Sequence, residues 1–199
     1  MEHMVIAVGR RYGSGGHEIG ERLAKRLGIP FYDRELVEMA SNKSGIAQGL
    51  LEIHNERAVQ ATLLKAKSGA GGQLIGELLF QLQSQIIREL AEESSCVIIG
   101  RCANYVLRDR ADLFSVFVTA PEEKRVQRIM ERNRMCEEDA RYAVKKVDRQ
   151  RREYYDHYTE GRWGEMEGYD LMVDSSILGI DGTAELLEEK ARAFAACLV

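Results

Sequence analysis

The sequence predicts an α/β fold of three layers, in which helices cover both faces of a parallel sheet of five strands. Short, continuous apolar runs, two of which end in glycine, are typical of strands buried in a parallel sheet. Segments with apolar residues at helical spacing lie between these runs, and such alternation favours parallel pairing with right-handed crossovers. A length of 199 residues suits a single domain, residues 1–199.

The elements follow from these patterns in order along the chain. Strands are expected at 5–8, 29–32, 96–99, 114–118 and 171–173. A first helix is expected over 19–27, ended by Gly28, and a second from Asp33 as N-cap to Ala40. Two more are expected on either side of a glycine-rich break at 68–72, the later one covering 74–93. The last three are expected from a Thr119–Glu122 capping box onward, over 137–155 and over 183–196. Ligands of such sheets bind at the carboxyl ends of the strands, where the segments rich in glycine and arginine are expected to converge.

Composition limits the classes of partner. A net charge of −4 gives no reason to expect nucleic acid, and no apolar run is long enough to span a membrane. The four cysteines are scattered without a CxxC pair, so neither a zinc site nor a disulfide framework is expected and no metal ligand is assigned. These features, with no signal-peptide pattern, predict a cytoplasmic protein.

A glycine-rich turn follows the first expected strand, at residues 9–20. Closely spaced glycines let the backbone curl so that several N–H groups converge, and the next helix adds its free donors and positive dipole. The expected occupant is a nucleotide phosphate; the alternative is a turn whose glycines serve only tight packing. The candidate phosphate ligands are Arg11, Gly13, Ser14, Gly15, Gly16 and His17.

This turn resembles a P-loop, G-x-x-x-x-G-K-[ST], with two departures. Gly16 stands where the lysine belongs, and His17 stands where Ser or Thr would hold magnesium. The pattern of this turn, an arginine followed by Gly-Ser-Gly-Gly and then Ile-Gly, resembles that of the cytidylate-kinase-like family. The matching residues are Arg10, Gly13, Ser14, Gly15, Gly16, Ile19 and Gly20. The resemblance implies a P-loop NTPase-like fold with a helical lid. Arg10 or Arg11 is expected to replace the missing lysine, because a guanidinium can bind two phosphate oxygens.

The resemblance also supplies candidates for the acceptor side. Arg101 matches the arginine of the family's Asp-Gly-Arg-Asp motif, which belongs to the nucleoside monophosphate site, although Ile99 and Cys102 replace its acidic residues. The alternative for Arg101 is a structural ion pair. Asp33 follows the second strand, where the family's substrate side begins, and it also has a sufficient role as N-cap. Residues 34–93 are the expected acceptor-binding helical region.

A basic helix completes the expected site. Lys145, Arg149 and Arg152 share one face of it, whereas Arg151 lies on another. Such a charge run alone would indicate only a solvated surface. However, residues 148–155, Trp163–Gly164 and 169–171 resemble the family's lid, which places the lid at 133–168. Arg149 is the first candidate to stabilise the transferring phosphoryl group, with Arg151 and Arg152 as further candidates.

The resemblance implies an ATP-dependent phosphotransferase that uses Mg²⁺ and acts on a nucleoside monophosphate such as CMP or dCMP. Arg10, Arg149, Arg151 and Arg152 would be catalytic. Two alternatives stay open: a nucleotide- or phosphate-binding regulatory module without catalysis, which the altered P-loop favours, and a kinase of another small metabolite. The expected partner is a nucleotide or small phosphorylated ligand, and the oligomeric state is not predicted.

Overall fold

The computed structural model describes residues 3–33, 36, 39 and 71–198. Within them, five strands form one sheet: β1 (Val5–Arg10), β2 (Phe31–Tyr32), β3 (Cys96–Ile99), β4 (Leu113–Thr119) and β5 (Leu171–Asp174). The order is β2-β3-β1-β4-β5, and every neighbouring pair is parallel. The expected parallel sheet of five strands is thus confirmed, with β1, which leads into the glycine turn, at its centre.

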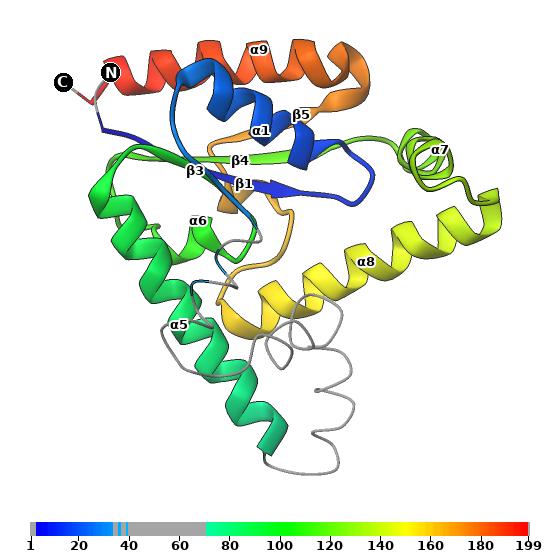
Figure 1. The fold of residues 1–199 in the computed structure, drawn as a ribbon, viewed down its shortest axis with the longest axis horizontal. Coiled ribbons are helices and arrows are strands. Elements are labelled where there is room, and N and C mark those ends of the chain that lie inside the picture. The colour runs from blue at the N-terminus through cyan, green and yellow to red at the C-terminus, as the bar shows by residue number, and fades with distance from the viewer. Residues whose placement is uncertain (1–2, 34–35, 37–38, 40–70, 199) are drawn as a thin grey trace.

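Helices cover both faces of this sheet (Figure 1). On one face lie α1 (Gly16–Leu27) and α9 (Ser175–Ala196), packed on Ile6 and Val8; on the other, α5 (Gly71–Glu93) and α6 (Ala103–Val106) pack on Val5 and Ala7. Successive strand side chains point to opposite faces, so a continuously apolar strand such as β1 can supply both cores. The three-layer prediction is confirmed.

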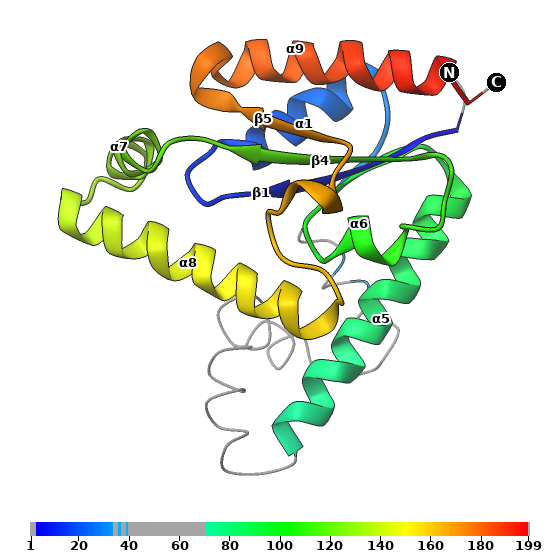
Figure 2. The ribbon, with the colours of Figure 1, turned by 180° about the vertical axis from the view of Figure 1, so that it is seen from behind.

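A helical pair extends from the carboxyl side of the sheet. It consists of α7 (Glu122–Asn133) and α8 (Glu137–Tyr158), which pack through Val126, Ile129, Ala140 and Val144. Figure 2 shows α8 running obliquely beneath the sheet towards α5. A short 3₁₀ helix, η1 (Met166–Gly168), precedes β5. In the described part of the chain, no helix is long and apolar enough to cross a membrane.

Several local expectations need correction. The Thr119–Glu122 capping box is wrong: Thr119 is the last residue of β4, and Pro121 is the N-cap of α7 without a side-chain hydrogen bond. Gly71 and Gly72 belong to α5 rather than to a break. The last helix begins at Ser175 and is interrupted at Gly179, whose φ is 68°. Of the helix expected after Asp33, the structure describes only Leu36 and Met39, and both are helical. The helix expected before the glycine-rich break lies outside the described residues.

Candidate active site

The glycine turn between β1 and α1 has the curled backbone that anion binding requires. Gly13 and Gly15 have φ of 81° and 79°, values that favour glycine. A Cβ on Gly13 would lie 2.7 Å from the carbonyl oxygen of Arg125, so the close approach of α7 also requires glycine. Ser14 is fully buried, and its hydroxyl donates to the Arg11 carbonyl at 2.8 Å. The first N–H groups of α1 have no intrahelical partner, so the turn and helix together supply the donors that an anion would need.

Arg10 lies across the position that a P-loop lysine would need. A Cβ on Gly16 would be 2.5 Å from the Arg10 Cβ and 3.3 Å from the Val118 Cβ. A Cβ on Gly100, at the end of β3, would collide with the Arg10 guanidinium. Two glycines therefore leave room for the Arg10 side chain, which puts a cation beside the glycine turn although the turn has no lysine.

Arg101 is held in a strained backbone. Gly100, Arg101 and Cys102 are consecutive left-handed residues, with φ of 68°, 54° and 55°. A non-glycine residue in this conformation costs about 1–2 kcal/mol, and such strain persists where the surroundings impose it, most often at functional sites. The Arg101 side chain is nevertheless buried at the carboxyl edge of the sheet.

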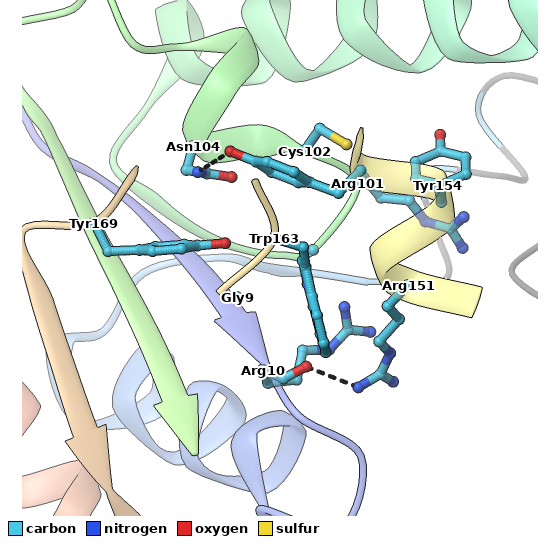
Figure 3. A pocket seen from close by; sticks show the side chains of 11 residues that line it. Gly9, Arg10, Arg101, Cys102, Asn104, Arg151, Tyr154, Trp163 and Tyr169 are labelled. Atoms are coloured by element: carbon cyan, nitrogen blue, oxygen red, sulfur yellow. Dashed lines mark hydrogen bonds between the residues drawn. The ribbon is translucent and has the colours of Figure 1, made fainter. Parts of the chain in front are cut away.

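These arginines meet in one pocket (Figure 3). It is lined by Gly9, Arg10, Gly100, Arg101, Cys102, Asn104, Arg151, Tyr154, Tyr155, Trp163 and Tyr169. Arg151 comes from α8, and its Nη1 donates to the Arg10 carbonyl at 3.0 Å. The pocket thus combines cations from the ends of β1 and β3 with one from the basic helix, an arrangement suited to phosphate.

Buried aromatic rings form the other wall of this pocket. Tyr154, Tyr155, Trp163 and Tyr169 cluster with Phe117 of β4. Burial raises the pKa of Tyr169, which keeps its phenol neutral. The rings pack the end of α8 and the segment before β5 against the sheet, as is usual for aromatics at this spacing.

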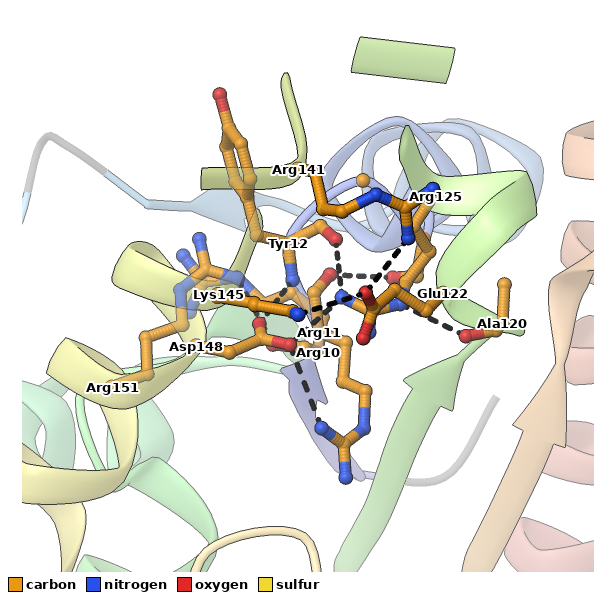
Figure 4. A network of polar contacts seen from close by, with 12 residues as sticks. Arg10, Arg11, Tyr12, Ala120, Glu122, Arg125, Arg141, Lys145, Asp148 and Arg151 are labelled. Carbon is orange, nitrogen blue, oxygen red and sulfur yellow. Dashed lines mark hydrogen bonds and ion pairs between the residues drawn. The ribbon is translucent and has the colours of Figure 1, made fainter. Parts of the chain in front are cut away.

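Asp148 of α8 is the centre of a buried network (Figure 4). Its carboxylate accepts hydrogen bonds from the Tyr12 backbone N–H at 2.7 Å and from Arg125 Nη1 at 2.8 Å, and Arg11 lies 3.5 Å away. Arg125 also donates to the carbonyls of Ala120 and Tyr12. This network joins the glycine turn, α7 and α8.

Three other basic residues of α8, Lys145, Arg149 and Arg152, face a second pocket. It is lined by Arg11, Glu122, Arg125, Val144, Lys145, Asp148, Arg149 and Arg152. The side chain of Arg149 is 63% exposed and lies 3.9 Å from Glu153. Arg151 therefore reaches the first pocket, while Arg149 and Arg152 line the second.

His17 and Asp33 form a pair beside the turn. The two side chains hydrogen-bond at 2.9 Å, and Arg10 lies 4.0 Å from the Asp33 carboxylate. The bond to Asp33 raises the pKa of His17, although partial burial opposes it. Burial would raise the pKa of Asp33, but the hydrogen bond from His17 and the charge of Arg10 bring it below its usual value. The Asp33 carboxylate beside the turn therefore has two basic neighbours, Arg10 and His17.

The sequence of the chain matches a known protein family. The sequence pattern described as "Cytidylate kinase-like family" matches residues 5–177, from β1 into the first turn of α9. The chain belongs to the cytidylate kinase-like family. No curated protein matches the sequence closely enough to count as a relative.

Solved structures agree on the fold. An uncharacterized protein from Eubacterium ventriosum superposes with a TM-score of 0.73 at 27% identity, over 95% of this chain and 98% of that one. A shikimate kinase from Bacteroides thetaiotaomicron gives 0.56 at 13% identity, over 96% and 99%. A deoxyadenosine kinase from M. mycoides, solved with dCMP and dCDP, gives 0.50 at 11%, over 96% and 100%. This cytidylate kinase-like chain therefore has the P-loop kinase fold.

The family implies magnesium, and the described residues offer it few protein ligands. None of them form a group of three or more His, Cys, Asp or Glu placed to hold a metal ion. The P-loop hydroxyl is replaced by His17, and Asp33 already accepts a hydrogen bond from that ring. Magnesium is usually held by one or two carboxylates together with substrate phosphates. An ion at this site would therefore be held mainly by the phosphates of the bound nucleotides.

Sequence reasoning missed the residues that position the site. Asp148 was named only as part of the lid segment, and Arg125, Tyr12 and Asn104 were not candidates. Asn104 donates to the Tyr155 hydroxyl at 2.9 Å and to the Gly168 carbonyl at 3.1 Å, which fixes the aromatic wall. These contacts join residues more than 50 positions apart in most cases, so no local pattern indicates them.

Proposed function

We propose that this protein is an ATP-dependent phosphotransferase whose acceptor is a nucleoside monophosphate such as CMP or dCMP. The observation that carries the proposal is the meeting of Arg10, Arg101 and Arg151 in one pocket beside the glycine turn. Phosphoryl transfer is catalysed mainly by positioning and by neutralising charge on the moving group. A pocket with arginines from three separate elements is suited to both tasks.

The donor phosphates would bind at the glycine turn. The backbone N–H groups of residues 13–17 and the dipole of α1 would hold them, with Arg11 and His17 at the margin. Arg10 would take the role of the P-loop lysine, because its side chain occupies the space beside Gly16. A guanidinium can bind two phosphate oxygens at once, which suits contact with both donor and transferring phosphates.

The acceptor phosphate would bind to Arg101, on the far side of the same pocket. The strained backbone at residues 100–102 holds this arginine in place, although the acidic residues of the family's motif are absent around it. Asp33 would contribute on the acceptor side through its pair with His17. The helical region 34–93 would form the acceptor wall, and 133–168 the lid.

Among the basic residues of α8, the geometry favours Arg151 for contact with the transferring group. Its guanidinium reaches the Arg10 carbonyl in the first pocket, whereas Arg149 and Arg152 line the second. Arg149 and Arg152 would join the reaction through a closing movement of α8, which is how lids in such enzymes exclude water.

A second candidate is a nucleotide-binding regulatory module without phosphotransfer. The replacement of the P-loop lysine and hydroxyl by Gly16 and His17 favours it. A kinase of another small metabolite is the third reading, since arginines bind any phosphate or carboxylate acceptor.

The test is ADP formation from ATP and Mg²⁺ with a panel of nucleoside monophosphates. We expect turnover that depends on one or two acceptors and falls at least about 100-fold in Arg101→Ala, since two charge-assisted contacts are worth roughly 3 kcal/mol. Arg192→Ala, which removes an exposed arginine of α9, is the matched control and should keep full activity. Tight ATP binding without turnover on any acceptor would instead favour the regulatory module.

A further inference from the structure

Asn104 lies in the wall of the arginine pocket, in the short helix α6 that follows Arg101. Its side-chain nitrogen donates to the Tyr155 hydroxyl at 2.9 Å and to the Gly168 carbonyl at 3.1 Å. An amide nitrogen carries two hydrogens, so these two bonds use both of them. Because the Gly168 carbonyl can only accept, turning the amide over would place two oxygens in contact. The orientation of Asn104 is therefore set by the fold.

The carbonyl oxygen of Asn104 is left to a ligand. Within the described part of the chain, both hydrogen bonds of this side chain are made by its nitrogen and neither by its oxygen. The residue is only partly buried and lines the pocket, so a molecule bound there can reach it. Since both N–H groups are already used, Asn104 offers such a molecule a hydrogen-bond acceptor and no donor.

This oxygen and the cations lie on opposite sides of the pocket (Figure 3). Asn104 and the hydroxyl of Tyr169 are on one side, and the guanidinium groups of the three arginines are on the other. Trp163 stands between the two sides in this view, and an indole ring is a surface on which a planar base can stack. A ligand that spans the pocket would have its phosphate at the arginines and its other end at Asn104.

We propose that Asn104 selects an acceptor nucleotide whose base carries an exocyclic amino group, a role that rests on the proposed function. With the phosphate on Arg101, the edge of the base farthest from the phosphate faces Asn104. The amino groups of cytosine and adenine donate to a carbonyl oxygen, whereas uracil and guanine carry an oxygen at the same place. Two acceptors in contact disfavour those bases. The neighbouring Tyr169 hydroxyl can rotate to donate or to accept, so the fixed amide sets the preference.

The first test compares ligands on the wild-type protein, which needs no substitution. CMP is compared with the monophosphate of 2-pyrimidinone riboside, and AMP with that of purine riboside; each analogue lacks only the amino group. We expect kcat/KM to fall about tenfold without the amino group, the effect of one neutral hydrogen bond. UMP and IMP, in which an oxygen replaces the amino group, should be poorer acceptors still.

Asn104→Ala connects this preference to the residue. The variant has no carbonyl oxygen at this place, so its kcat/KM for CMP and for the analogue without the amino group should be about equal. It also loses the bonds to Tyr155 and Gly168, and its melting temperature should fall. A ratio of two acceptors measured on one protein cancels any general loss of activity. Asn133→Ala, which removes an exposed asparagine at the end of α7, is the control and should keep the wild-type ratio.

Calorimetric binding of each nucleoside monophosphate, measured beside turnover, separates this inference from the proposed function. If the wild type neither binds nor phosphorylates any of them, the proposed function fails and the role of Asn104 fails with it. If the wild type is active but accepts the analogues equally well or prefers UMP or GMP, the kinase stands and the inference is overturned. An unchanged ratio in Asn104→Ala also overturns it. So does a preference for CMP over dCMP that disappears in this variant, because the oxygen would then bind the sugar hydroxyl.

Discussion

The carboxylate of Asp148 accepts a 2.7 Å hydrogen bond from the backbone N–H of Tyr12. One partner belongs to α8 and the other to the start of the glycine turn. The same carboxylate is 2.8 Å from Arg125 of α7, in a buried environment. One side chain therefore links the backbone of the glycine turn to the helix that carries Arg151.

Asp148→Ala is expected to lower the free energy of unfolding by about 3–5 kcal/mol. The substitution leaves the buried Arg125 guanidinium without its carboxylate, and removal of one partner from a buried ion pair has about this effect. It also leaves the Tyr12 N–H without its acceptor. Chemical denaturation followed by circular dichroism measures the change.

Two further variants show whether charge or hydrogen bonding carries this effect. Asp148→Asn keeps an oxygen for the Tyr12 N–H but loses the charge, so an intermediate loss is expected. Glu138→Ala removes an exposed carboxylate of the same helix and should stay within about 0.5 kcal/mol of the wild type. Equal stability of Asp148→Ala and Glu138→Ala would contradict the network.

Gly16→Ala is expected to destabilise the protein by about 1–3 kcal/mol, although alanine favours helices by about 1 kcal/mol over glycine. The added Cβ would lie 2.5 Å from the Arg10 Cβ and force that side chain away from the turn. ATP affinity, measured by calorimetry, should fall together with stability. The comparison variant is Gly168→Ala, whose Cβ would meet nothing closer than 3.8 Å. If Gly16→Ala were as stable as the wild type and bound ATP equally well, Arg10 would not occupy the place of the lysine.

The sheet and its covering helices could be predicted from the sequence because their signals are local. Continuous apolar runs marked β1, β3 and β4, and the spacing of Ile19, Leu23 and Leu27 marked α1. The Thr119–Glu122 motif failed because register with β5 extends β4 through Thr119, and pairing within the sheet outweighed a local capping preference. Gly71 and Gly72 were assigned to a break from their composition, yet α5 begins there.

The positions of the arginines could be predicted only in part. Helical spacing separates Arg151 from Arg149 and Arg152, and the structure puts them in different pockets. Helical spacing cannot tell which face meets the sheet, because that depends on the contact between Asp148 and Tyr12.

The pair of His17 and Asp33 predicts a pH dependence. The pKa of His17 is raised above its ordinary value of 6.5, so the stabilisation from this group is complete below pH 6.5 and is lost as the pH rises through the raised pKa. The pKa of Asp33 is lowered below 3.8, so its contribution is present above that pH and is lost as the pH falls through the lowered pKa. The pair therefore stabilises the fold between those limits.

Titration of His17 by NMR measures this coupling directly. Asp33→Asn removes the charged partner, so the midpoint of the His17 ring signals should move down towards 6.5. Glu138→Gln, a carboxylate on the exposed side of α8, serves as the charge-matched control and should leave that midpoint in place. A His17 midpoint that is the same in Asp33→Asn and the wild type would show that the two side chains do not interact in solution.

The strained backbone at Arg101 allows its structural and functional roles to be separated. Arg101→Ala and Arg101→Gly both remove the guanidinium, so both should lose acceptor binding to the same extent. The glycine variant should be more stable than the alanine variant by about 1–2 kcal/mol, because φ of 54° is free of steric cost only for glycine. Thermal unfolding and calorimetric binding measure the two quantities separately.

Arg134 provides the matched comparison, because it has the same φ of 54° at an exposed helix end. Arg134→Gly should raise the free energy of unfolding by about 1 kcal/mol, since glycine is the preferred residue at a left-handed C-cap. It should not change acceptor binding, since Arg134 lines neither of the two pockets described above. Equal stability of Arg101→Gly and Arg101→Ala, alongside a gain in Arg134→Gly, would show that the turn at residues 100–102 relaxes when the arginine is removed. The guanidinium, rather than the packing around the turn, would then be what holds that backbone in its left-handed conformation.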